Sequence, residues 1–314
     1  MSRYLAQRLG QAAIVLLATF TVAFVLLQAM PGDAVLIKFL DGNMALTPEQ
    51  LAELRIAYGV DAPLWRQYLH SLAGFATGNF GYSVRAGVPV ADLIAANLPF
   101  TLRLAALAFL AACVLAVLLA VLANLRGFGW VRAAVRSVPS LFVAIPVFWL
   151  GIMLIQVFSF QLGLVSVIAP GPVEEMILPV LTLAVPISAP IAQVLIRNID
   201  AVLAEPFVAV ARAKGASHVW VLWRHVARNA LLPTLTMAGV LFGELLSGAV
   251  VTEAVFGLNG LGGLTQQAVA NQDVAVLQAI VVISAAAFVA INLLVDLLYP
   301  VLDPRLGVRR GRAA

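Results

Sequence analysis

The chain has 314 residues, of which 62% are hydrophobic and only 11% are charged, and its mean hydropathy is +1.01. A water-soluble domain of this length does not need so much apolar sequence for its core, so the composition excludes a soluble protein and indicates an integral membrane protein. The net charge of +4 is explained by the position of Lys and Arg relative to the membrane and implies no nucleic-acid partner.

Six apolar stretches are long enough to cross a bilayer, because about 20 residues of helix span a hydrocarbon core of roughly 30 Å. In chain order they are Leu9–Gln28, Thr101–Ala123, Val138–Phe160, Ile177–Ile196, Ala230–Val251 and Val274–Tyr299. The first is longer than the apolar region of a signal peptide, so we expect it to remain as a span. The sequence therefore predicts an all-α polytopic membrane protein with six transmembrane helices and the lipid bilayer as its surroundings.

The stretch after the first span is the only one outside the membrane that is large enough to fold. We expect residues 1–30 to be the N-terminus and first span, residues 31–98 an external segment with short helices, and residues 99–314 a five-helix core. Capping residues predict external helices over residues 45–59 and from Pro63 to Leu72. This segment is either a cap over the mouth of the protein or a docking surface for an external partner.

Several predicted spans contain prolines, among them Pro139 and Pro146 in the third and Pro179, Pro186 and Pro190 in the fourth. Each removes a backbone donor and favours a kink. Such kinks suit a pathway that opens and closes, and they are also common packing features.

Positive charge indicates the orientation. Of the 19 Lys and Arg residues, 14 lie before the first span, between the second and third, between the fourth and fifth, or after the sixth. Because Lys and Arg concentrate in cytoplasmic loops, both termini are expected to be cytoplasmic.

The sequence shows no catalytic constellation. The three histidines, His70, His218 and His225, are not part of a nucleophile or metal-ligand motif. A P-loop needs a Lys directly after Gly, and neither Lys38 nor Lys214 has that neighbour. We expect no catalytic residue, no metal site and no cofactor bound by this chain, so that any ATP hydrolysis belongs to another subunit.

Two charged residues within predicted spans are candidates for a translocation pathway. Glu244 lies near the middle of the fifth span, where an ionised carboxylate costs about 2.5–3.5 kcal/mol on insertion scales. It either lines a polar pathway and binds a cationic group, or pairs with Arg103 of the second span.

The cytoplasmic region over residues 197–229 contains a predicted helix–turn–helix elbow. Gly215 can end the first helix in the left-handed conformation, and Ser217 can cap the second. The apolar residues of the second helix are expected on one face at positions i, i+3, i+4 and i+7, namely Val219, Leu222, Trp223 and Val226. The elbow is either an interfacial helix on anionic lipid or a knob that a cytosolic motor pushes.

A resemblance favours the second interpretation. The sequence ARAKGAS at residues 211–217, followed by HVARNALLPTLT at residues 225–236, resembles the cytoplasmic signature of permease subunits of ATP-binding cassette (ABC) importers of the dipeptide, oligopeptide and nickel group. Further similar stretches are MPGDA (30–34), YGVDAPLWRQYL (58–69), GNFGYS (78–83), LPFTLRLA (98–105), IPVFWLG (145–151), ILPVLTLA (177–184), SGAVVTEAVFGLNGLGGL (247–264) and VDLLYPVLDPRL (295–306). MPGDA and GNFGYS are similar to the B-type member of the usual permease pair.

The resemblance implies a type I importer permease in the bacterial inner membrane, with an external insertion after the first span. Its implied partners are a second homologous permease, two ABC ATPase subunits that carry ATP and Mg, and an extracytoplasmic substrate-binding protein. The implied ATPase-coupling residues are Ala211, Arg212, Ala213, Lys214, Gly215, Ala216 and Ser217.

The chain departs from the family pattern at several positions. Phe207 and Ala209 stand where Tyr and Arg are frequent, Asn259 stands where Pro is common, and Glu244 is not expected. Glu244 bears on the substrate, which the family does not determine. Di- or oligopeptides are the leading substrates, with nickel, a metal–metallophore chelate or glutathione as alternatives. The alternatives of other classes are an ion-coupled secondary transporter that uses Glu244 and a membrane scaffold.

Overall fold

The computed structural model describes residues 2–28, 62–83, 85–124 and 129–302. Within these residues the regular secondary structure is helical apart from one isolated bridge between Tyr82 and Pro89, which confirms the predicted all-α class. Residue contacts divide it into two compact units, one formed by residues 1–101 and 257–289 and the other by residues 102–256 and 290–314. The helix predicted over residues 45–59 lies outside the described residues.

The number of helices that can cross a membrane agrees with the six predicted spans. Four are long and apolar enough by themselves, Ala6–Gln28, Val90–Asn124, Glu174–Leu203 and Val274–Leu294, and two bent helix pairs bring the number to six if each pair is one span.

The first unit contains α1 (Ser2–Gln28), α4 (Leu64–Ala76), α12 (Leu261–Ala270) and the beginnings of α5 (Val90–Asn124) and α13 (Val274–Leu302). Pro63 precedes α4, as predicted, and the helix continues four residues beyond the expected Leu72. Tyr68 of α4 packs edge-on against Phe20 and Phe24 of α1, with ring centroids 5.6 and 5.3 Å apart. Burial of these rings holds α4 against α1.

The first unit contains a buried hydrogen bond between side chains that lie far apart in the sequence. The Ser83 hydroxyl donates to the Asp273 carboxylate over 2.6 Å, and both side chains are only 2% exposed. The same carboxylate accepts from the backbone N–H of Val276 at the start of α13 over 3.4 Å. Asp273 therefore links the loop before α5 to the beginning of the last helix.

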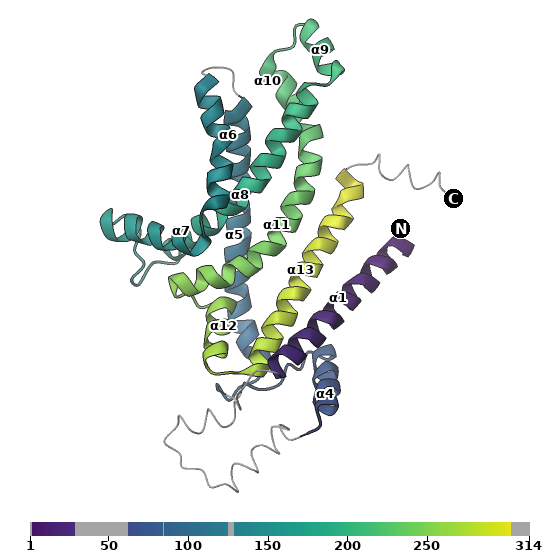
Figure 1. Ribbon diagram of the computed structural model, residues 1–314, viewed down its shortest axis with the longest axis vertical. Helices are drawn as coiled ribbons and strands as arrows, with labels where there is room; N and C mark the ends of the chain where they lie inside the picture. The colour runs from purple at the N-terminus through teal and green to yellow at the C-terminus, as the bar shows by residue number, and fades with distance from the viewer. Residues whose placement is uncertain (1, 29–61, 84, 125–128, 303–314) are drawn as a thin grey trace. The chain divides into compact units, whose positions relative to one another are not determined.

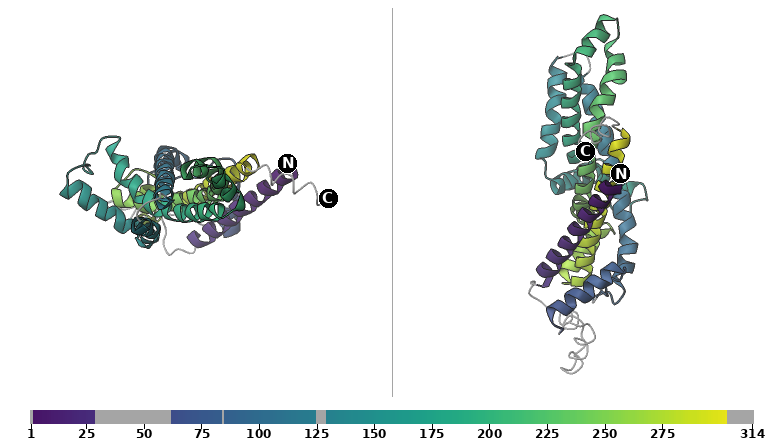
Figure 2. Two further views of the ribbon diagram at one scale, coloured as in Figure 1. Left: turned by 90° about the horizontal axis from the view of Figure 1, so that it is seen from above. Right: turned by 90° about the vertical axis from the view of Figure 1, so that its right-hand side faces the viewer.

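The second unit contains the rest of α5 together with α6 (Gly129–Ala144), α7 (Val147–Leu154), the π-helical segment η1 (Ile155–Gln161) and α8 (Glu174–Leu203). It continues through α9 (Pro206–Ala213), α10 (His218–Val221), the π-helical segment η2 (Leu222–Val226) and α11 (Ala227–Phe256). Helices α6 and α11 both pack along α8 (Figures 1 and 2).

The third predicted span is not one helix, which corrects the expectation for Val138–Phe160. The chain turns by 103° between α6 and the α7–η1 segment. Pro146 has an extended backbone, with φ −61° and ψ 132°, and precedes α7. A proline lacks the N–H that would continue α6 and disfavours helical geometry at the residue before it, so the helix ends there. The other four prolines noted above lie inside α6 and α8.

Candidate functional site

The elbow begins with α9, whose ends are set by local sequence. Glu205 is extended and Pro206 occupies the first turn, where its missing N–H costs nothing. At the other end the N–H of Gly215 donates to the Arg212 carbonyl over 2.9 Å, and that of Ala216 donates to the Ala211 carbonyl over 3.1 Å. These two bonds form a Schellman motif, for which the φ of +87° at Gly215 is required. The predicted glycine cap is confirmed.

The second arm of the elbow begins at the predicted residue. Ser217 is extended and its hydroxyl accepts a hydrogen bond from the backbone N–H of Trp220 over 3.3 Å. This bond satisfies one of the free donors at the start of α10. Gly215 and Ser217 together therefore set the four-residue turn between α9 and α10.

The buried face of the second arm agrees with the predicted one at Val226, which is buried, and at Leu222, which is partly buried, and differs from it elsewhere. Val221 and Val226 are fully buried, whereas Val219 and Trp223 are 58% and 68% exposed. The reason is the π-helical segment η2, because i→i+5 bonding widens the turn and aligns residues five apart. The predicted face assumed a regular α-helix throughout.

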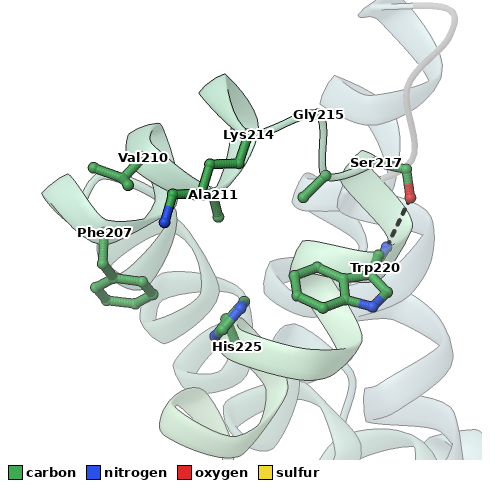
Figure 3. Close-up of a pocket in the computed structure, with 9 residues that line it drawn as sticks. Phe207, Val210, Ala211, Lys214, Gly215, Ser217, Trp220 and His225 are labelled. Atoms are coloured by element: carbon green, nitrogen blue, oxygen red, sulfur yellow. Dashed lines mark hydrogen bonds between the residues drawn. The ribbon is translucent and has the colours of Figure 1, made fainter.

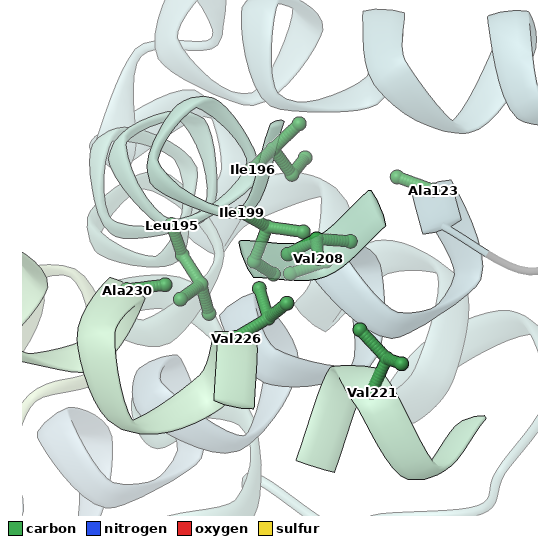
Figure 4. Packing of buried hydrophobic residues seen from close by; sticks show 9 residues of the cluster. Ala123, Leu195, Ile196, Ile199, Val208, Val221, Val226 and Ala230 are labelled. Carbon is green, nitrogen blue, oxygen red and sulfur yellow. The ribbon is translucent and has the colours of Figure 1, made fainter. Parts of the chain in front are cut away.

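A compact apolar base supports the elbow. Val208 of α9 is 1% exposed and lies among Ile199 of α8 and the fully buried Val221 and Val226 (Figure 4). Ala123 at the end of α5 joins the same cluster. Both arms of the elbow therefore share one core with the ends of α5 and α8, and they are expected to move together with those ends.

Polar contacts also join α10 to the end of α5 and α6 to α8 in the same region. A ring nitrogen of His218, Nε2, lies 3.2 Å from the carbonyl oxygen of Asn124. Two parallel bonds of 2.8 Å join the Arg136 guanidinium of α6 to the Asp200 carboxylate of α8. Sequence reasoning identified neither pair, because the partners are 94 and 64 positions apart and no local pattern connects them.

The predicted coupling residues lie on the outer side of this base. Arg212, Ala213, Lys214, Gly215 and Ser217 are exposed, and Ala211 and Ala216 are partly buried. An open hollow of about 690 Å³ is lined by five of them, Ala211, Lys214, Gly215, Ala216 and Ser217, and by Phe207, Val210, Trp220 and His225 (Figure 3). Phe207 and Val210 are 42% and 54% exposed. The lining is mostly apolar, with Lys214 and His225 as its basic residues.

The two predicted pathway residues are both exposed in the single chain, Arg103 on α5 and Glu244 on α11. Within the described part of the chain no ion pair joins them. The pairing alternative therefore has no support from the structure, and their role in a pathway stays a prediction.

Among the described residues no group of three or more His, Cys, Asp and Glu side chains is placed to hold a metal ion. The expectation of no bound cofactor stays a prediction. The candidate site is thus an exposed surface built from small, apolar and basic residues.

Comparisons with known proteins give the family of the chain. The family model described as "Binding-protein-dependent transport system inner membrane component" matches residues 90–308, and the N-terminal model of the corresponding membrane components matches residues 1–105. The chain is 35% identical over 315 residues to the probable peptide ABC transporter permease protein y4tP of Sinorhizobium fredii, covering 98% of this chain and 99% of that protein. It is 34% identical over 310 residues to the glutathione transport system permease protein GsiC of Escherichia coli K12, with the same coverage.

Solved structures show the same fold. An inward-facing methionine ABC transporter, MetNI, aligns with a TM-score of 0.56 and 18% identity, covering 67% of this chain and 96% of the solved one. An amino acid ABC transporter crystallised with histidines aligns with a TM-score of 0.54 and 20% identity, covering 66% of this chain and 93% of the other. At these identities the likeness concerns the fold alone.

Proposed function

Because the chain belongs to the family of binding-protein-dependent transport system inner membrane components, we propose that it forms half of the translocation pathway of an ABC importer and couples that pathway to cytosolic ATPases. It is a multi-pass permease of the inner membrane, and its family depends on a substrate-binding protein and an ATPase. The observation that carries the coupling role is the elbow, which exposes Ala211–Ser217 above a core shared with α5 and α8.

In the proposed coupling step, a displacement of the elbow is transmitted to the membrane helices. An ATPase surface would occupy the hollow beside Phe207 and Val210, and the small side chains of Ala211, Ala213 and Gly215 would allow close approach of its backbone. A push on α9 would reach α8 through Val208, because closely packed interiors transmit displacement. ATP-driven closure of the ATPases would thereby switch the pathway between inward-facing and outward-facing states.

The proposed importer contains further subunits besides this chain. The chain contains no Gly–Lys pair of the kind a P-loop requires, so two ABC ATPase subunits would bind and hydrolyse MgATP. A second homologous permease would supply the other half of the pathway. Both termini would be cytoplasmic, in line with the distribution of Lys and Arg.

The exposure of Glu244 supports its place in the pathway. Its helix buries Leu241 and Leu245 while Glu244 is exposed. A carboxylate facing lipid at this depth would cost about 2.5–3.5 kcal/mol. This face of α11 is therefore better explained by a water-filled pathway or a protein neighbour, and Arg103 would supply a complementary charge.

Di- or oligopeptides are the proposed substrates. One relative at 35% identity is named as a probable peptide permease and another at 34% as a glutathione permease; glutathione is itself a small peptide with amino and carboxylate groups. Nickel and metal–metallophore chelates remain alternatives. Membership of the family decides against the ion-coupled carrier.

Isolation of the complex tests the proposed function. The tagged chain is expressed together with its neighbouring genes and extracted in mild detergent, its subunits are identified by mass spectrometry, and ATP hydrolysis is measured. We expect a second permease of the same family, two P-loop subunits per complex by native mass spectrometry, and vanadate-sensitive hydrolysis. Recovery of the folded chain alone and without ATPase activity would contradict the proposal.

A further inference from the structure

The imidazole of His218 contacts polar atoms of two other helices. His218 is the first residue of α10 and is partly buried. Its Nε2 atom lies 3.2 Å from the carbonyl oxygen of Asn124, the last residue of α5. Its Nδ1 atom lies 3.5 Å from Nη2 of Arg212 in α9. One side chain therefore connects both arms of the elbow with the end of α5.

The chemistry of the two partners assigns the hydrogen atoms of the ring. A backbone carbonyl only accepts hydrogen bonds, so Nε2 of His218 is the donor to Asn124. A guanidinium only donates, so Nδ1 is the acceptor in the longer contact with Arg212. The two partners thus select one tautomer and one orientation of the ring.

The carbonyl of Asn124 is a well-held anchor for this contact. The last carbonyls of a helix have no donor within the helix and need one from elsewhere, and His218 supplies it. Asn124 is 6% exposed, and its side-chain Nδ2 donates to the Ala120 carbonyl over 2.9 Å. The acceptor of the His218 bond therefore belongs to a buried residue whose own side chain is fixed on α5.

The apolar contacts between α5 and the elbow are less directional. Helix α5 contributes two alanines, Ala120 and Ala123, to the cluster around Val208 and Val221 (Figure 4). Apolar contacts of this kind do not depend on direction, whereas a hydrogen bond weakens steeply when its angle departs from the preferred range. The His218 bond is thus the contact that specifies how the end of α5 sits against the elbow.

We infer that His218 is a positioning residue for coupling, which holds the end of α5 to the elbow so that a displacement of α9 reaches α5 as well as α8. This inference rests on the proposed function, in which an ATPase displaces α9. Val208 connects α9 with α8, and the ring of His218, held by Arg212 from the side of α9, connects it with α5. The elbow and the end of α5 then keep one separation in both nucleotide states.

Distance measurements between two spin labels test this inference. The labels are attached to Leu118→Cys in α5 and Ala209→Cys in α9, in the Cys113→Ala background and in the whole complex co-expressed from the neighbouring genes. Leu118 and Ala209 are both exposed. Double electron–electron resonance measures their separation without nucleotide and after trapping with MgATP and vanadate. With native His218, we expect the same mean distance in both states.

Substitutions of His218 show whether its hydrogen bonds are the cause. His218→Leu removes both bonds, so α9 should move without α5, and the mean distance should change on trapping by about 2 Å, the size of common helix shifts in switching proteins. His218→Gln is the matched control, because its amide can donate to Asn124 and accept from Arg212, and it should keep one distance. A residue that only stabilised the fold would lower the melting temperature without making the distance depend on nucleotide.

Two results would overturn the inference and leave the proposed function intact. One is a distance that changes on trapping in the labelled complex with native His218, a measurement that does not depend on the folding of any His218 variant. The other is an unchanged distance on trapping in the His218→Leu complex. The lack of vanadate-sensitive hydrolysis in the labelled complex with native His218 would instead refute the proposed function, and the inference would lose its premise.

Discussion

At the scale of single residues, Gly215 determines the shape of the elbow. Its φ of +87° lies in the left-handed region, and a Cβ atom built on it meets nothing within 4 Å. The requirement for glycine is therefore conformational and not a matter of space. An L-residue at such a position costs about 1–2 kcal/mol.

Replacing Gly215 with Ala should weaken the docking of the ATPase. The cost of about 1–2 kcal/mol corresponds to a roughly 5- to 30-fold smaller population of the native turn. We expect several times less ATPase subunit to be retained on the purified Gly215→Ala chain, at an unchanged level of the chain in the membrane.

Gly129→Ala provides the matched control, because Gly129 also has open space around it but lies in α6 without a positive φ. Its variant should retain the ATPase subunit as the unsubstituted chain does. Equal retention by the Gly215→Ala variant would exclude the turn from coupling.

At the scale of elements, two helical irregularities decide what the helices present to their neighbours. At the π-helical η2, Val221 joins the predicted Val226 in the core, whereas the predicted Val219 and Trp223 are exposed. The break at Pro146 turns the α7–η1 segment away from α6 by 103°. In both cases a local change of backbone hydrogen bonding changes which side chains meet their neighbours.

The π-helical register predicts which valine matters for stability. Val221→Ala removes two methyl groups that are buried in the structure and lie off the predicted apolar face, and it should lower the free energy of unfolding by roughly 1–3 kcal/mol. Val219→Ala at the exposed position should change it by less than about 0.5 kcal/mol. Thermal unfolding of both variants in the same detergent measures the difference. A larger effect for Val219→Ala would mean that the second arm is a regular α-helix.

At the scale of the whole molecule, the distribution of Lys and Arg among the loops predicts the orientation of the chain. The proposed topology places the loop before α6 in the cytoplasm and the segment between α4 and α5 outside. The chain has a single cysteine, Cys113, so a cysteine-free background requires one substitution.

Cysteine labelling from outside the cell should therefore separate two exposed positions. In the Cys113→Ala background, a membrane-impermeant maleimide added to intact spheroplasts should label Ala86→Cys, and should label Trp130→Cys only after lysis. Both native residues are exposed in the structure. The reverse labelling pattern would invert the proposed orientation.

Several features of this protein follow from the sequence by itself, since they depend on residues close together in the chain. The apolar stretches, the glycine end of α9 and the serine cap of α10 are of this kind, because spanning depends on the length of an apolar run and capping on the few residues around a helix end. The family motifs could be read directly for the same reason.

The tertiary structure alone decided which side chains meet. His218 reaches Asn124, Arg136 reaches Asp200, and Ser83 reaches Asp273 across 94, 64 and 190 positions. It also decided that the elbow shares its core with α5 and α8, and that the α7–η1 segment turns away from α6 at Pro146. The physical reason is that burial and polar pairing are properties of packed neighbours, whereas a sequence pattern reports only the periodicity of each helix and assumes that the helix is regular.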